Sequence, residues 1–152
     1  MYVIEPLYAG DVSIDSEYEN GTITQLIYEL DEGWNSDLLI AGTDVFAVGG
    51  ELLCLLKSGV FKGFTLKNME MRYEGDNSLP DFMQLVPLEL LKIKCGEYDP
   101  KACNDIYFTD SVGQLAVSDT LFENQDEKTT NTVQSRYKKA LKSTKMRKNR
   151  TF

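Results

Sequence analysis

Apolar residues recur along the chain in short runs separated by glycine-, asparagine- and aspartate-rich stretches, a pattern typical of short strands joined by turns. Runs rich in β-branched and aromatic residues favour strands. We therefore expect strands over residues 2–5, 12–14, 22–30, 44–48, 64–73, 105–109 and 114–117, the last two forming a hairpin. Pro6 is expected to stop the first strand, and a register change is expected near Lys67 and Asn68.

Two short helices are expected among these strands. The first covers residues 51–58, with a glutamate in its first turn and Gly59 placed to end it. Ser118 can cap a second helix that reaches Phe122 or beyond. Residues 82–86 and 88–94 are apolar without a clear period, so strand and helix both remain open for them.

One short pattern occurs twice in the sequence. Residues 46–53 and 115–122 both read apolar-Ala-Val, then two small or capping residues, an acid or threonine, and two large apolar residues. Each copy predicts a strand that enters a helix directly, although eight residues can also agree by chance. The expected fold class is α+β, with a mixed or antiparallel sheet, a few short helices and two strand-to-helix elements related by this weak internal echo.

Charge is segregated along the 152 residues. Residues 1–56 contain eleven acids and no lysine or arginine, whereas residues 128–152 contain nine bases and no acid. We expect residues 1–127 to form a single acidic domain and residues 128–152 a basic C-terminal tail that is disordered or helical. The acidic half either serves solubility alone or attracts a basic partner protein.

Composition also limits the chemistry. The absence of histidine removes Ser-His-Asp and Cys-His catalysis, and no phosphate-binding loop or nucleophile elbow is present. Cys54 lies in a leucine-rich run and is expected to be buried, and the spacing of Cys95 and Cys103 is not that of a zinc site. The sequence has no basic n-region and no long apolar segment, so we expect a cytoplasmic protein. Because the catalytic and metal-binding patterns are missing, we expect no enzyme activity, cofactor or metal.

A family resemblance is carried by residues 37–122. Residues 45–52, followed by residues 56–64, and a second element at Val117, Ser118 and Asp119 resemble small α+β immunity proteins encoded beside bacterial polymorphic or contact-dependent toxins, together with their uncharacterised relatives. Gly49 stands where the pattern prefers serine, and the basic tail has no counterpart. The resemblance implies a non-enzymatic inhibitor that binds one toxin.

We therefore expect the acidic N-terminal surface to dock on a basic toxin domain, such as a nuclease, and to block access of its substrate. The expected contact residues are Asp11, Asp15, Glu17, Tyr18, Glu19, Asp31, Glu32, Trp34 and Asp37. Trp34 suits either the core or an interface anchor, and Tyr18 lies between two glutamates, which is unusual for a core position. As alternatives, the basic tail binds nucleic acid or serves assembly, including a homodimer.

Overall fold

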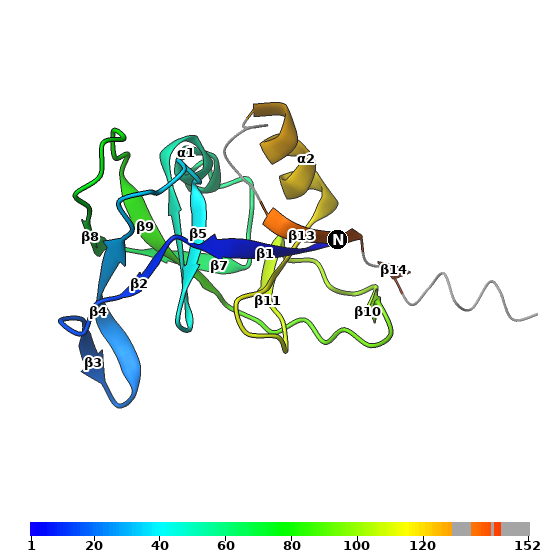
Figure 1. The fold of residues 1–152 in the computed structure, drawn as a ribbon. Coiled ribbons are helices and arrows are strands. Elements are labelled where there is room, and N and C mark those ends of the chain that lie inside the picture. The colour runs from blue at the N-terminus through cyan, green and yellow to red at the C-terminus, as the bar shows by residue number, and fades with distance from the viewer. Residues whose placement is uncertain (129–134, 141, 144–152) are drawn as a thin grey trace, which may run out of the picture.

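The computed structural model describes residues 1–128, 135–140 and 142–143, and it is built mostly from strands (Figure 1). The main sheet has the order β11 (Ile106–Phe108), β12 (Leu115–Val117), β1 (Tyr2–Tyr8), β5 (Leu39–Gly42), β6 (Val45–Gly49), β9 (Phe82–Pro87) and β7 (Phe64–Lys67), and β13 (Ser135–Ala140) also pairs with β1. A second sheet contains β2 (Gly10–Val12), β3 (Glu17–Glu19), β4 (Thr22–Leu30) and β8 (Met69–Arg72). A two-stranded sheet joins β10 (Glu97–Tyr98) to β14 (Lys142–Ser143). The expected α+β class with a mixed sheet is confirmed at this level.

The main sheet curves until its two ends approach each other. The segment after β9 runs beside β11, where the Leu91 amide donates to the Phe108 carbonyl at 2.8 Å and the Phe108 amide donates to the Glu89 carbonyl at 3.2 Å. The Asp105 amide also donates to the Lys62 carbonyl at 2.9 Å. These contacts tie the chain near β7 and β9 back to β11.

The largest core cluster lies on the face of this curved sheet that both helices cover. It combines buried residues of six strands with leucines of α1 (Gly50–Lys57) and α2 (Asp119–Lys128). Alternation along the strands places Ile40 and Ala47 on the opposite face, where they pack in a separate cluster with Tyr28 and Leu30 of β4. The second sheet is therefore anchored to the main sheet by an apolar layer.

The two expected strand-to-helix junctions are present. Strand β6 ends at Gly49 and α1 begins at Gly50, whereas β12 ends at Val117 and α2 begins at Asp119. The Leu121 amide donates to the Ser118 hydroxyl at 3.2 Å, which confirms the predicted cap. Gly59 follows α1 with a φ of 82°, a conformation that favours glycine at a helix end.

Several predicted boundaries differ from the structure. Strand β1 continues through Pro6 to Tyr8, and a register shift between Ile4 and Pro6 accommodates the missing amide. The early strand expected at 12–14 is β2, at Gly10–Val12. The apolar run 88–94 forms neither a named strand nor a helix.

The single strand predicted over 64–73 is two strands in different sheets. Strand β7 pairs with β9, whereas β8 pairs with β4, and the chain passes from one sheet to the other at Asn68. The expected irregularity near Lys67 and Asn68 is thus a change of sheet. Residues 82–86 fall within β9, which resolves the choice between strand and helix there.

One further expectation falls mostly outside the described residues, and another is wrong. Within the tail, residues 135–140 and 142–143 form strands β13 and β14, with β13 antiparallel to β1, and the other residues after 128 lie outside the described part. Cys54 is exposed, because Leu52, Leu53 and Leu56 form the buried stripe of α1 and Cys54 falls on its other side.

Candidate protein-binding surface

The acidic residues of two distant segments meet on the second sheet. Strand β8 runs parallel to β4, with Leu26 opposite Met69 and Glu29 opposite Arg72. This pairing places residues 69–81 beside residues 10–37. We call these two segments together the acidic lobe; it contains β2, β3, β4 and β8 and the loops that follow β4 and β8.

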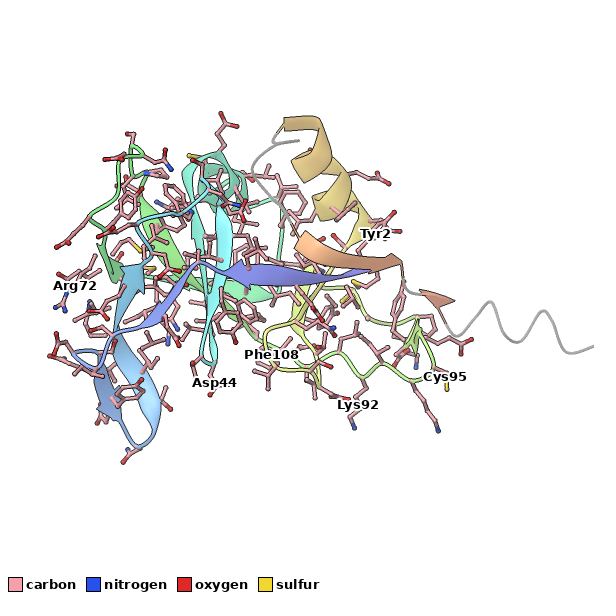
Figure 2. The ribbon with its side chains drawn as sticks, viewed as in Figure 1. Tyr2, Asp44, Arg72, Lys92, Cys95 and Phe108 are labelled. Carbon is pink, nitrogen blue, oxygen red and sulfur yellow. The ribbon has the colours of Figure 1, made fainter. Side chains whose placement is uncertain are left out.

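The acidic lobe carries a large excess of negative charge. Its eleven exposed acids are Asp11, Asp15, Glu17, Glu19, Glu29, Asp31, Glu32, Glu70, Glu74, Asp76 and Asp81. Arg72 is the one base in the same residues. Figure 2 shows Arg72 at one end of the molecule and Lys92 near the other. The charge is therefore segregated in space as well as in sequence.

Arg72 lies among three carboxylates. Its guanidinium donates to Asp15 at 2.7 Å and lies 3.9 Å from carboxylate oxygens of both Glu29 and Glu70. The hydrogen bond to Asp15 is the main reason that the pKa of Arg72 is raised. Because all four side chains are exposed, this cluster contributes little to stability. Its three acids still outnumber its one base.

A bulge in β4 near the tip of the lobe places Ile23 opposite Tyr18. Glu17 lies opposite Gln25, but Tyr18 lies opposite Ile23, so that Thr24 is the extra residue of β4. Successive strand residues point to opposite faces, so Tyr18 and Ile23 share the face opposite to that of Glu17. This face looks toward the main sheet.

Tyr18 and Ile23 line a groove of about 350 Å³ between the two sheets. Its other lining residues are Val12, Gly21, Thr22, Thr43, Asp44, Val45, Lys67, Gln84 and Val86. Tyr18 is 57% exposed, whereas Gln84 on the opposite wall is buried. An exposed aromatic ring beside an open groove is a suitable anchor for a protein partner.

The structure keeps most of the predicted contact residues on the surface and buries two of them. Asp11, Asp15, Glu17, Tyr18, Glu19, Asp31 and Glu32 are exposed. Trp34 is 4% exposed and Asp37 is 1% exposed, so both are removed from the expected contact surface. The Trp34 indole N–H donates to the Asp37 carbonyl at 3.0 Å, which satisfies its polar group inside the protein.

Four of the exposed predicted acids lie in two groups along β4. Glu17 and Glu19 pair with the beginning of this strand, whereas Asp31 and Glu32 follow its end. Gln25 and Asp31 are six positions apart along the chain, a span of roughly 20 Å. Asp11 lies apart from both groups. Its carboxylate accepts hydrogen bonds from the Thr43 amide at 2.8 Å and from the Thr43 hydroxyl at 3.0 Å. The hydrogen bond from the Thr43 amide is the main reason that the pKa of Asp11 is lowered.

Sequence reasoning did not select five acids of the lobe. These are Glu29, Glu70, Glu74, Asp76 and Asp81. Four of them belong to the segment 69–81, which only the parallel pairing of β4 and β8 brings to this surface. The alternation Met69, Glu70, Met71, Arg72 does indicate a half-exposed strand, but alternation does not identify the strand with which it pairs.

Tyr28 fixes the lobe to the main sheet. Its side chain is 0% exposed, and its hydroxyl donates to the Ala41 carbonyl of β5 at 2.7 Å. Burial raises the pKa of Tyr28, and the nearby negative charge of Asp11 adds to the shift. The folded protein therefore keeps a proton on this phenol at pH values where the unfolded chain has lost it.

This difference predicts an alkaline loss of stability. Above the unfolded pKa near 10, the unfolded state binds fewer protons, so the free energy of unfolding should fall by up to about 1.4 kcal/mol per pH unit. Tyr28→Phe should be less stable by about 1 kcal/mol at pH 9, through the lost hydrogen bond, and should lack this slope. Urea unfolding at pH 9, 10 and 11 measures the difference in free energy of unfolding between the unchanged protein and Tyr28→Phe. This difference should become smaller as the pH rises, and a constant difference would contradict the explanation. Tyr8→Phe, which changes an exposed tyrosine, is the control.

Comparisons with protein-family models, with curated proteins and with solved structures find no match for this chain. Within the described residues, no helix has the length and apolar character needed to cross a membrane. The same residues contain no group of three or more acidic or cysteine side chains arranged to hold a metal ion. The functional argument therefore rests on the charge, shape and exposure of the acidic lobe.

Proposed function

We propose that this chain is an immunity-type binding protein that neutralises a bacterial toxin by covering a basic surface of the toxin with the acidic lobe. The observation that carries the proposal is the presence of eleven exposed acids against one base on a single sheet and its loops. A field of this kind accelerates encounter with a cationic protein and repels nucleic acid. Covering the basic residues that a nuclease uses to hold its substrate would block the reaction without any chemistry on this chain.

The position of the basic tail supports this assignment. Strands β13 and β14 pair with β1 and β10, and Figure 1 places them at the end of the molecule away from β3 and β8. The described part of the tail therefore does not cover the carboxylates of the acidic lobe. These carboxylates remain exposed to a partner.

The proposal predicts that a neighbouring gene encodes a toxin with a basic C-terminal domain, and the test uses that domain as the partner. Replacing Glu17, Glu19, Asp31 and Glu32 by their amides should slow association by about tenfold or more at low salt and flatten its dependence on ionic strength. Stopped-flow association between about 20 and 500 mM salt measures both effects.

A matched variant removes the same charge elsewhere. Glu89, Asp99, Asp110 and Glu123 are exposed and lie outside the lobe. Converting these four to amides changes the net charge equally, so a role for net charge alone predicts the same loss of rate. Equal rates for the two quadruple variants, or rates that are indifferent to salt, would contradict docking by the acidic lobe.

A further inference from the structure

One edge of β4 lacks a neighbouring strand at its beginning. Strands β2 and β8 both pair with Tyr28 and Glu29, so they must lie on opposite edges of β4. The Ser13 amide donates to the Ile27 carbonyl at 2.7 Å, and the Ile27 amide donates to the Ser16 hydroxyl at 3.0 Å, which keeps the chain between β2 and β3 on the edge of β2.

Strand β3 therefore covers residues 22–25 on that edge, and β8 begins its pairing only at Leu26 on the other. Among the described residues, no strand pairs with residues 22–25 on the β8 side. We call this stretch the free edge of β4. Unpaired strand edges are positions where a segment of another chain can add to a sheet.

The free edge borders the groove that Tyr18 lines. At Lys67 the chain still pairs with Gln84 of β9, and two residues later Met69 pairs with Leu26 of β4. The divergence of β7 from β8 leaves space beside residues 22–25, and Thr22, Ile23 and Lys67 all line the groove. Main-chain groups thus lie beside a groove that is lined by both apolar and polar side chains.

We propose that the free edge of β4 accepts an extended segment of the basic partner as an added strand, with one apolar side chain of that segment resting in the groove against Tyr18 and Ile23. This inference rests on the proposed function and identifies the part of the acidic lobe that makes the closest contact. Alternation along a strand would place every second side chain in the groove and the others in solvent. The segment that fits carries lysine or arginine on both sides of a short run of β-branched residues.

Charge supports this occupant. Glu17 and Glu19 lie on β3, which pairs with the other edge of the same β4 residues, and the lobe exposes eleven acids against one base. Lys67 is the one base that lines the groove, where Asp44 also lies. A lysine ammonium donates three hydrogen bonds, and a carbonyl of an added strand can accept one of them. A nucleic-acid strand offers no such ladder and is repelled by the lobe.

The probe for this proposal is the synthetic peptide Arg-Lys-Val-Thr-Val-Lys-Arg. In NMR titrations with the full chain, we expect shifts and slowed amide exchange at residues 22–25 and at the groove. The same peptide with N-methyl groups at alternate residues keeps its charge but cannot complete a ladder. It should bind at least about tenfold more weakly, because the donors that strand addition uses are blocked.

Two protein variants complete the test. Tyr18→Ala should weaken binding of the unmethylated peptide by about tenfold, whereas Tyr8→Ala, which removes a similarly exposed tyrosine outside the groove, should leave it unchanged. Equal binding of the two peptides, or equal effects of the two variants, would overturn strand addition. That result would leave the salt-dependent association of the acidic lobe intact, so the two proposals fail separately.

Discussion

Trp34→Ala is expected to lower the free energy of unfolding by about 3–5 kcal/mol, since it removes a large buried side chain. Trp34 packs edge-on against Tyr73 and Phe82, with ring centroids 5.7 and 5.9 Å away. The Asn77 side-chain amide donates to the Trp34 carbonyl at 2.6 Å. The indole thus joins three segments: the loop after β4, the loop after β8 and the start of β9. A loss of this size is a large part of the stability of an ordinary domain.

The effect on the acidic lobe should be uneven. The loops that Trp34 joins carry Asp31, Glu32, Glu74, Asp76 and Asp81. The tip of the hairpin between β3 and β4 does not depend on these contacts. Trp34→Ala should therefore increase amide exchange in residues 31–37 and 73–81 and leave that in residues 17–25 nearly unchanged.

Trp34→Phe separates packing from binding. Phenylalanine keeps an aromatic ring in the same cluster and loses the hydrogen bond to the Asp37 carbonyl, so its destabilisation should be well below that of alanine. Because Trp34 is buried, Trp34→Phe should bind the partner as the unchanged protein does. Urea unfolding and the association rate measure the two properties. A large loss of affinity without loss of stability would place Trp34 at the interface and contradict its burial.

The sequence predicts local elements better than it predicts their partners. Strand β4 has the predicted bounds, and the cap at Ser118 is where its side chain and the apolar pair after it indicate. These features depend on neighbouring residues. By contrast, β8 pairs with β4 across about forty residues of chain, and alternation in β8 is compatible with any neighbour. The same reasoning explains β13, whose basic composition gives no indication of its pairing with β1.

For the candidate surface too, the sequence predicts local features but not the contacts between distant segments. The acids of residues 11–32 were identifiable because they occur without a base, and all of them are exposed. The burial of Trp34 depends on Tyr73, Asn77 and Phe82, which are distant in sequence. The pairing of Tyr18 with Ile23 depends on a bulge, and no residue type in β3 or β4 requires one there. Tertiary packing thus decides which acidic-segment residues remain available to a partner.

Gly10→Ala is the second large change, and it tests how the acidic lobe is held in place. Gly10 has a φ of 153°, and a Cβ built there would collide with the Glu29 carbonyl oxygen. It pairs with Leu30 at the point where the chain leaves β1 for the second sheet. An alanine would force β2 away from β4, and we expect a destabilisation of about 2–4 kcal/mol from backbone strain and overpacking.

Gly33→Ala is the matched control. Gly33 lies in the same lobe, and a Cβ added there meets no atom within 4 Å. Thermal unfolding should therefore separate the two variants clearly, although both add the same methyl group. If Gly10→Ala is folded at the temperature of the binding experiment, the displaced β2 and β4 should also move Asp11 and Glu29, whose strands pair at that position, and slow association with a basic partner. Equal melting temperatures for the two variants would mean that β2 and β4 are not in close contact at Gly10, and the acidic lobe would then need another explanation for its position.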